Sequence, residues 1–282
     1  SFSKTMLEHS ERYVSDMVER FNLNEKSMVI EIAANDGYLL QYVKDKQIPC
    51  LGIEPTASTA EAARSKGIEV VEEFFGLALA KRLVEQGFSA DLTVANNVLA
   101  HVPDINDFVT GYSLLLKPDG VATFEFPYLI NLVEKNQFDT IYHEHYSYLS
   151  LNAVDTIFNA NGLRVFDVEL VDIHGGSLRV LAERKDSPRE KFKNSRVTGL
   201  LAEEESKGYL STKAYAGFQE VAEKAKDDLL KFLITAKEEG KSVCAFGAAA
   251  KGNTFINFAG IRPDLIRAVA DSNPAKQGKF MP

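Results

Sequence analysis

Two hydrophobic patterns alternate through the first half of the chain. Short apolar runs, typical of buried parallel strands, are separated by longer segments in which apolar residues recur at helical spacing. Strand and helix alternate five times, which predicts an α/β fold with helices on both faces of a parallel sheet. The expected strands are 28–30, 50–53, 67–71, 90–97 and 121–126, and the expected helices are 5–22, one beginning at Leu39, 57–66, 78–86 and 105–116, with a turn at 117–120.

The pattern changes after the fifth strand. Helices within 128–138 and over 151–161 precede two strand-like segments, 164–173 and 177–184, which only a short turn separates. Strands joined so closely form an antiparallel hairpin. Five parallel strands closed by such a hairpin are the layout of the class I methyltransferase sheet, a Rossmann-like fold. A nicotinamide-binding Rossmann domain would continue with parallel crossovers.

The last part of the chain predicts a second, incomplete α/β unit. A polar stretch at 185–199 and a helical pattern at 200–237 lead to a buried strand at 242–246 and another strand at 266–271. Two strands cannot bury a sheet, so we expect this unit to be cut short. The predicted division is a methyltransferase domain (1–185), a linker and helix (186–239), and the start of a C-terminal α/β substrate-binding domain (240–282).

Composition and charge exclude several classes of protein. Of 282 residues, 45% are hydrophobic and 26% are charged, as in ordinary globular proteins. The net charge of −8 argues against a nucleic-acid-binding surface, and no apolar run is long enough to span a membrane. Since the N-terminus has no signal segment, we expect a cytoplasmic protein. The chain begins without methionine, so we expect it to be a piece of a longer protein.

The two cysteines predict neither a disulfide nor a zinc site. Cys50 and Cys244 both lie in apolar runs that have the pattern of strands. We therefore expect them to be small core residues.

The turn after the first strand has the features of a nucleoside-cofactor site. Small residues join that strand to the next helix, so a ligand can lie against backbone N–H groups. Eighteen positions after Asp36, Glu54 ends the second apolar run. An adenosine-binding α/β domain has a carboxylate there that accepts hydrogen bonds from ribose hydroxyls. The alternative is a strand–turn–helix unit of any doubly wound fold.

A histidine-rich run is the most unusual part of the sequence. His143 and His145 flank Glu144, with Tyr142 and Tyr146 outside them. An imidazole beside a carboxylate can be oriented and made more basic, so the run predicts general acid–base chemistry. The alternatives are a polar surface loop and a metal site, for which no further ligands are evident nearby.

The other histidines carry weaker signals. His101 follows the fourth strand, at the edge of the sheet where ligands bind. A helix-edge histidine with a satisfied hydrogen bond is the alternative there. His9 lies off the apolar stripe of its helix, so we expect it in solvent. His174 lies in the hairpin turn, where we expect a turn residue and not a catalyst.

A second turn of small residues, 247–252, follows the strand at 242–246. Its backbone N–H groups and Lys251 could hold a phosphate. The order of residues is not that of a nucleotide-hydrolysis loop, and a plain tight turn is the alternative.

Six motifs together resemble those of one family. The sequence looks like the S-adenosylmethionine-dependent C-methyltransferases that act on nucleotide-linked 4-keto deoxysugars. The YHEH run and the second glycine-rich block are more specific than the cofactor turn, which class I methyltransferases share. The resemblance covers nearly the whole chain, in the runs EIAANDGYLLQY, GIEPTASTAEAA, ANNVLAHVPD, FDTIYHEHYSYLS, HGGSLRV and FGAAAKGNTFINF.

The resemblance implies a catalytic role for the histidine-rich run. His145 would be the general base that removes a proton from the sugar carbon next to the ketone. Tyr142, Glu144 and His101 would orient this base or stabilise the enolate oxygen. The resulting carbon nucleophile would attack the methyl group of S-adenosylmethionine in line.

The resemblance also implies a cofactor site and a substrate site. Glu54 would hold the ribose, and Asn96 would contact the methionine or adenine portion of the cofactor. Lys251 and Asn253 would contact the nucleotide diphosphate. The implied turn residues at the cofactor are Ala33, Asn35, Asp36 and Gly37.

The sequence departs from the family's pattern in two respects. Ala33 stands where the family usually has glycine, and alanine is tolerated there if φ is negative. The cysteines of the family's N-terminal zinc module are absent from this chain.

Other functions remain open at this stage. A methyltransferase that acts on oxygen or nitrogen of a small molecule would use the same cofactor domain. A cofactor-binding subunit without activity, or a scaffold, is a further alternative. We expect a small-molecule nucleotide sugar as the partner and neither nucleic acid nor a membrane.

Overall fold

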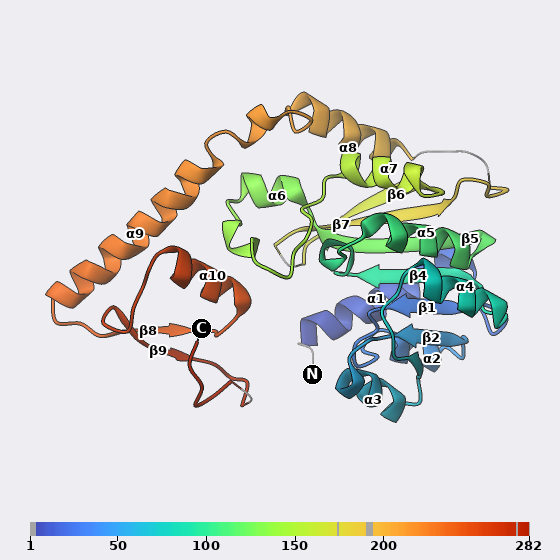
Figure 1. Ribbon diagram of the computed structural model, residues 1–282, viewed down its shortest axis with the longest axis horizontal. Helices are drawn as coiled ribbons and strands as arrows, with labels where there is room; N and C mark the ends of the chain where they lie inside the picture. The colour runs from blue at the N-terminus through green and yellow to red at the C-terminus, as the bar shows by residue number, and fades with distance from the viewer. Residues whose placement is uncertain (1–3, 174, 190–193, 275, 282) are drawn as a thin grey trace. The chain divides into compact units, whose positions relative to one another are not determined.

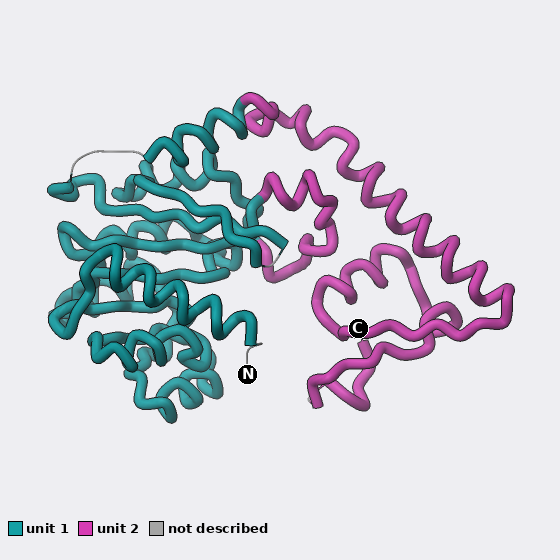
Figure 2. The backbone as a smooth tube through the Cα atoms, turned by 180° about the vertical axis from the view of Figure 1, so that it is seen from behind, with its two compact units in different colours: residues 1–128, 146–205 teal, residues 129–145, 206–282 magenta. Residues whose placement is uncertain are grey.

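The computed structural model describes residues 4–173, 175–189, 194–274 and 276–281. His174, expected to be a turn residue, lies outside the described residues. The chain divides into two compact units (Figure 2). Unit 1 comprises Ser1–Tyr128 and Tyr146–Glu205, and unit 2 comprises Leu129–His145 and Ser206–Pro282. The three-part division expected from the sequence stays a prediction.

Unit 1 is built on a seven-stranded sheet in the order β3-β2-β1-β4-β5-β7-β6 (Figure 1). The first five strands are parallel neighbours, and β7 runs antiparallel to both β5 and β6. The predicted fold class is confirmed. The strands are β1 (Val29–Ile32), β2 (Cys50–Ile53), β3 (Glu69–Val71), β4 (Ala90–Asn96), β5 (Leu116–Pro127), β6 (Leu163–Val171) and β7 (Ser177–Arg184).

The hairpin turn between β6 and β7 lies at the ligand-binding edge of this sheet. Since β5 and β6 are both antiparallel to β7, they run in the same direction. The residues that follow β6 therefore share an edge with the residues that follow β1, β4 and β5. The helices of unit 1 are α1 (Lys4–Phe21), α2 (Leu40–Asp45), α3 (Ala57–Ser65), α4 (Leu77–Glu85), the 3₁₀ turn η1 (Leu99–His101), α5 (Ile105–Leu115), α7 (Leu151–Ala160) and α8 (Ser195–Ser206).

Strand β5 divides the core into two faces. Its side chains alternate, because successive residues of a strand point to opposite faces of the sheet. Phe124 contacts Tyr112 of α5 and Phe158 of α7, with ring centroids 4.6 and 4.7 Å apart. Thr123 and Glu125 point the other way, toward α1. One face of β5 therefore carries aromatic side chains, and the other carries the hydrogen-bonded Thr123 and Glu125 beside Val121 of the apolar core.

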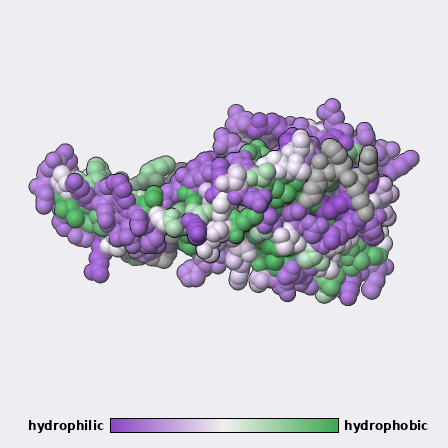
Figure 3. All heavy atoms as spheres, turned by 90° about the horizontal axis from the view of Figure 1, so that it is seen from above, coloured by the Kyte–Doolittle hydropathy of each residue, from purple (hydrophilic) through white to green (hydrophobic). Residues whose placement is uncertain are grey.

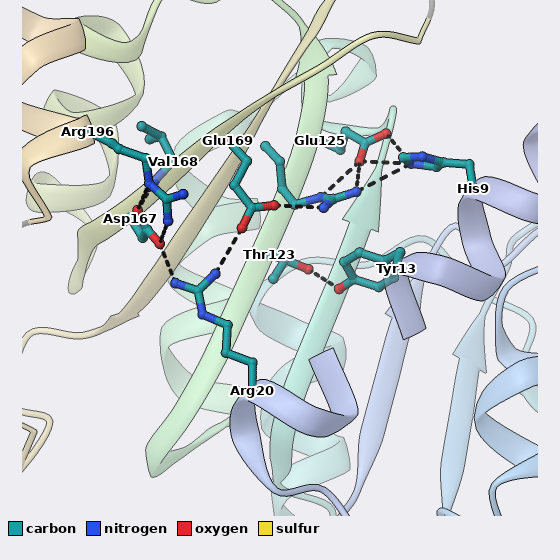
Figure 4. A network of polar contacts seen from close by, with 10 residues as sticks. His9, Tyr13, Arg20, Thr123, Glu125, Asp167, Val168, Glu169 and Arg196 are labelled. Carbon is teal, nitrogen blue, oxygen red and sulfur yellow. Dashed lines mark hydrogen bonds and ion pairs between the residues drawn. The ribbon is translucent and has the colours of Figure 1, made fainter. Parts of the chain in front are cut away.

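Helix α1 lies on the polar face of β5, and this overturns the expectation for His9. His9 is only 6% exposed, and its Nε2 lies 3.2 Å from Oε1 of Glu125. Tyr13, one turn further along α1, shares a hydrogen bond with Thr123 (Figure 4). Burial raises the pKa of Tyr13 well above its usual range. The position of His9 off the apolar stripe reflects a polar partner inside the protein and not exposure to water.

Three expectations about local structure are wrong. The turn expected at 117–120 lies inside β5, where the pairing with β4 shifts register between Ala90 and Leu92. The helix expected over 200–237 is interrupted after α8 and resumes at Phe218. Cys244 is exposed instead of buried. For the helix and for Cys244, the apolar pattern alone does not report which partner, if any, covers a segment.

Unit 2 contains a two-stranded parallel sheet of β8 and β9. Phe246, at the end of the strand expected to be buried, is 82% exposed. Val221 and Phe232 belong to the apolar positions at helical spacing in α9, and both are exposed. In Figure 3, green atoms lie among purple ones around this helix. The elements are α6 (Leu129–Glu134), η2 (Phe138–Thr140), η3 (Thr212–Tyr215), α9 (Phe218–Glu238), β8 (Val243–Phe246), α10 (Ala250–Phe258) and β9 (Ile266–Ala270).

Among the residues that the structure describes, no helix combines the length and the apolar character that crossing a membrane requires.

The buried carboxylate of Glu204 joins segments that flank the histidine-rich run. Glu204 belongs to α8 and is 1% exposed. It accepts hydrogen bonds from the Tyr128 hydroxyl (2.8 Å) and from the N–H groups of Leu151 (2.6 Å) and Asn152 (2.9 Å), which begin α7. Tyr128 also forms a parallel bridge with Leu149. The two ends of the segment between β5 and α7 are thus held together inside unit 1.

Replacing this carboxylate should destabilise unit 1. Glu204→Ala removes the acceptor that Tyr128, Leu151 and Asn152 share, so we expect the free energy of unfolding to fall by about 1–3 kcal/mol. Urea denaturation followed by circular dichroism measures the change. Glu205→Ala, at the exposed next position of the same helix, is the control and should change stability by less than about 0.5 kcal/mol. Equal losses in the two variants would contradict this role for Glu204.

Candidate cofactor pocket and catalytic segment

A pocket of about 550 Å³ opens at the carboxyl edge of the sheet in unit 1. Its walls come from the start of α1, the turn after β1, the end of β4 and the residues after β6. Three of the predicted cofactor residues, Ala33, Asn35 and Asn96, lie in these walls. The full lining is Thr5, Met6, Ala33, Asn35, Tyr38, Asn96, Asn97, Val98, Asp172 and Ile173.

The turn after β1 uses left-handed backbone conformations at alternate residues. Ala33, Asn35 and Gly37 have φ of 56°, 52° and 72°. The positive φ favours glycine at position 37, and a Cβ there would also lie 2.4 Å from Cδ1 of Ile68, so that side chain would have to move. The condition under which alanine is tolerated at position 33, a negative φ, is therefore not met. Its Cβ is held in a region that costs an L-residue about 1–2 kcal/mol.

Glu54 supports this turn from the end of β2. It is 6% exposed. Its Oε2 accepts the N–H of Asn35 (3.0 Å), and its Oε1 accepts the N–H of Thr56 (2.9 Å). The carboxylate therefore connects the turns that follow β1 and β2. Asp36 faces Lys66, with Nζ and Oδ2 3.5 Å apart. Glu54, Asp36 and Gly37 shape the pocket without lying in its walls.

Asn96 has the properties of a ligand-binding side chain. It lies in the pocket wall and is 8% exposed. Within the part of the chain that the structure describes, neither Oδ1 nor Nδ2 has a hydrogen-bond partner. A buried amide without partners costs folding energy unless a ligand satisfies it. The residues present thus fit a polar cofactor at this position.

Glu31 adds a buried carboxyl group close to the same turn. It lies on β1 and is 1% exposed. Burial raises the pKa of Glu31 well above its usual range, and the negative charges of Asp36 and Glu54 raise it further. Its Oε2 has no partner among the described residues. Burial and the two neighbouring carboxylates thus disfavour the charged form of Glu31, and a cationic group brought nearby would favour it.

Sequence reasoning missed several residues of the pocket wall. Tyr38 directly follows the predicted turn, so its position in sequence was a usable signal. Asp172 and Ile173 reach the pocket because β6 runs parallel to β5, which the hairpin prediction did not specify. Thr5 and Met6 come from α1, and no local pattern indicates that the start of this helix meets the turn after β1.

His101 ends the turn η1 beside the chain that follows the histidine-rich run. The carbonyl of Ala100 accepts hydrogen bonds from the N–H groups of Tyr146 (2.8 Å) and Ser147 (3.2 Å). The residue after His145 is therefore fixed against the residue before His101. The N–H of His101 itself donates to Val98 O at 2.7 Å.

The histidine-rich run in unit 2 holds one imidazole in a defined orientation. Nδ1 of His145 lies 2.8 Å from the carbonyl oxygen of Thr140. Because a carbonyl only accepts, this contact assigns the proton to Nδ1 and the lone pair to Nε2 of the neutral ring. The ring of Tyr142 lies against it, with centroids 4.4 Å apart and planes inclined by 30°. His143 and Glu144 are exposed neighbours.

Unit 2 brings the histidine-rich run together with the second glycine-rich block. Phe138 of η2 contacts Phe255 and Phe258 of α10, each with centroids 5.1 Å apart. Helix α10 carries the predicted substrate residues Lys251 and Asn253. Asn253 lies in the wall of a second pocket, of about 900 Å³.

The glycine-rich turn of unit 2 repeats the carboxylate arrangement of unit 1. Oδ2 of Asp271, which follows β9, accepts the N–H of Ala248 (2.8 Å), and its Oδ1 accepts the N–H of Asn273 (2.8 Å). The pKa of Asp271 is lowered by these backbone hydrogen bonds and by Lys276. In the turn that was expected to hold phosphate, the N–H group of Ala248 therefore already donates to a negatively charged carboxylate.

Across the described ranges, no group of three histidine, cysteine or acidic side chains is arranged to hold a metal ion.

Comparison with known proteins agrees with this architecture. Residues 6–168 match the family described as "Methyltransferase domain", and residues 172–282 match the "C-methyltransferase C-terminal domain". The chain resembles the solved structures of the PH0226 protein from Pyrococcus horikoshii (TM-score 0.53, 13% identity, 65% of this chain, 92% of that one) and of magnesium protoporphyrin IX methyltransferase from Synechocystis with bound S-adenosylhomocysteine (0.50, 14%, 64%, 84%). At these identities the similarity shows the fold alone.

The fold and the pocket define a class I methyltransferase, a class whose methyl donor is S-adenosylmethionine. The chain belongs to the methyltransferase family whose model matches residues 6–168, and its residues 172–282 are similar to the C-terminal domain of C-methyltransferases. A curated relative, the C-methyltransferase NovU of Streptomyces niveus, is 33% identical over 278 residues. The aligned region covers 99% of this chain and 66% of the length of NovU.

Glycine at position 33 should relieve strain in the turn after β1. We expect Ala33→Gly to raise the free energy of unfolding by up to about 1 kcal/mol, because relief of the left-handed Cβ outweighs the greater chain entropy of glycine. Ala34→Gly is the matched control. Ala34 is fully buried and absent from the residues with positive φ, so its replacement should lower stability by about 1 kcal/mol. Thermal unfolding measures both, and a loss of stability in both variants would contradict the strain at Ala33.

Proposed function

We propose that this protein transfers a methyl group from S-adenosylmethionine to a carbon next to the ketone of a nucleotide-linked keto deoxysugar. The family supports the reaction class, and the pocket in unit 1 supports a nucleoside cofactor. The histidine-rich run and the second glycine-rich block support the substrate. We also propose that the protein acts in the cytoplasm.

The orientation of the His145 ring is the observation that carries this proposal. Methyl transfer to carbon requires removal of a C–H proton. Methyl transfer to the oxygen of a hydroxyl group or to the nitrogen of an amine does not. A proton on Nδ1, donated to Thr140 O at 2.8 Å, leaves the Nε2 lone pair as the basic site. The stacked ring of Tyr142 restricts rotation of the imidazole. A histidine fixed in one tautomer and orientation suits a general base.

In this proposal the other residues of the segment stabilise charge. Proton removal creates an enolate, and its oxygen needs donors or a nearby positive charge. Tyr142 and His101 are proposed as these donors, and Glu144 as a group that orients the base. Lys251 and Asn253 are proposed to contact the nucleotide diphosphate.

In unit 1 the proposed cofactor residues bind and orient. Glu54 would accept a ribose hydroxyl with the lone pairs that Asn35 and Thr56 leave unused. Asn96 would satisfy its buried amide on the cofactor. Ala33, Asn35, Asp36 and Gly37 shape the backbone on which the cofactor lies. The bound sulfonium supplies an already activated methyl group, so the work of the protein is positioning.

Calorimetric titration with S-adenosylhomocysteine tests the cofactor site. We expect Glu54→Gln to weaken binding by about tenfold or more, because the amide replaces one acceptor oxygen by a donor. Glu61→Gln, on the exposed surface of α3, is the control and should bind as the wild type does. Unchanged affinity in Glu54→Gln would remove this residue from the cofactor site.

Turnover of a nucleotide-linked 4-keto deoxysugar tests the base. We expect His145→Ala to lower kcat by about 10²–10⁴-fold, since a general base contributes that much. Its affinity for S-adenosylhomocysteine should be unchanged. The exposed neighbour is the control, and His143→Ala should retain turnover within a few-fold.

Deuterium uptake at the substrate carbon in heavy water separates transfer to carbon from transfer to oxygen or nitrogen. Wild-type protein should exchange that hydrogen, and His145→Ala should not. Methylation of a substrate without any exchange at carbon would favour transfer to oxygen or nitrogen. Binding of S-adenosylhomocysteine without methylation of any keto sugar would favour a scaffold.

A further inference from the structure

The first turn of α1 forms one wall of the pocket in unit 1. Thr5 and Met6 lie in that wall. His9 follows Met6 by three positions, so the two side chains project from the same side of the helix, one turn apart. Ser10 adds a hydrogen bond from its hydroxyl to the carbonyl of Met6 (3.0 Å). Whatever holds His9 therefore also holds the start of the helix.

Glu125 connects this helical wall to the strand wall opposite. Its two carboxylate oxygens lie 3.2 and 3.3 Å from Nε2 of His9. Its backbone pairs with Asn96 in the sheet, and its carbonyl accepts the N–H of Asn97 at 2.6 Å. Asn96 and Asn97 both lie in the pocket wall. One residue thus fixes the strand wall with its backbone and the helical wall with its side chain.

The contact between the side chains of His9 and Glu125 is buried and includes a charged carboxylate. Glu125 is 2% exposed, and Arg179 of β7 donates to its Oε2 from Nη2 (2.9 Å) and Nε (3.1 Å). Burial alone would raise the pKa of Glu125. The hydrogen bond with His9 and the charge of Arg179 outweigh burial and hold its pKa below the usual range. Glu125 is therefore an anion at neutral pH, and loss of a donor leaves a buried charge less well compensated.

The other end of α1 has a second attachment. Arg20 contacts Asp167, and its Nη1 donates to Oε1 of Glu169 at 2.9 Å. Oε2 of the same carboxylate accepts from Nη1 of Arg179 at 2.8 Å, so this attachment is connected to Glu125 through Arg179. Arg20 lies eleven residues beyond His9, which is about 16 Å along a helix. Replacing Arg20 therefore perturbs the docking of α1 away from its first turn, and it serves as the control.

We propose that His9, Glu125 and Arg179 form a positioning cluster that holds the first turn of α1 as a wall of the cofactor pocket. The affinity for S-adenosyl ligands then depends on the contact between His9 and Glu125. His9 is a positioning residue, because Thr5 and Met6, and not His9, line the pocket. This inference rests on the proposed cofactor site in unit 1.

Calorimetric titration with S-adenosylhomocysteine tests the cluster in the whole chain. His9→Leu removes the donor to Glu125, and we expect the Kd to rise by about tenfold. His9→Gln keeps a donor at a similar reach and should remain within about threefold of the wild type. Arg20→Met removes the attachment at the other end of α1, and its Kd should also remain within about threefold of the wild type. Wild-type affinity in His9→Leu, or an equal loss in Arg20→Met, would overturn the proposal.

Hydrogen exchange on the wild-type protein tests the same inference if His9→Leu does not fold. Addition of S-adenosylhomocysteine should slow exchange of the amides at 5–10 more than of those at 16–21, because only the first turn meets the ligand. Equal effects at both ends would overturn the proposal.

The two proposals fail in different ways. If Glu54→Gln loses binding while His9→Leu keeps it, the cofactor site stands and the positioning cluster does not. If the wild-type protein does not bind S-adenosylhomocysteine, both fail.

Discussion

Buried carboxylates are the constraint on which the site in unit 1 depends. A carboxylate that folding removes from water has to receive hydrogen bonds or an opposite charge, or it costs several kcal/mol. Glu54, Glu125 and Glu204 each meet this requirement with donors from segments far apart in the sequence. Glu54 joins two turns, Glu125 joins a helix to two strands, and Glu204 joins a strand end to two helices. These contacts hold the walls of the pocket and the two ends of the segment that contains the histidine-rich run.

Strand β5 combines stability and function because its two faces differ. Phe124 contributes to an aromatic cluster that needs only apolar neighbours. Glu125, the next residue, points into a polar network with His9 and Arg179. The same strand then leads through Tyr128 to the segment with His145. Strand β5 therefore contributes both to the core and to the polar network, because successive side chains of a strand point to opposite faces of the sheet.

Much of the fold and part of the site could be predicted from the sequence. The period of the apolar residues identified the strands β2 and β7 at their observed bounds, and the spacing between the small-residue turn and Glu54 identified one edge of the pocket. The burial of His9 could not be predicted, because its partner, Glu125, is 116 residues away. The exposure of Cys244 and Phe246 also escaped prediction, since an apolar run does not report whether another layer covers it.

The sequence by itself determined the order of strands and helices, the hairpin and the types of side chain available for chemistry, because these follow from local periodicity and residue identity. Only the tertiary structure decided that Thr5 and Met6 meet the turn after β1, that Asn96 is buried without a partner among the described residues, and that Nδ1 of His145 faces the carbonyl of Thr140. Those outcomes depend on contacts between distant segments and on the exclusion of water, and neither is encoded in any local stretch of the chain.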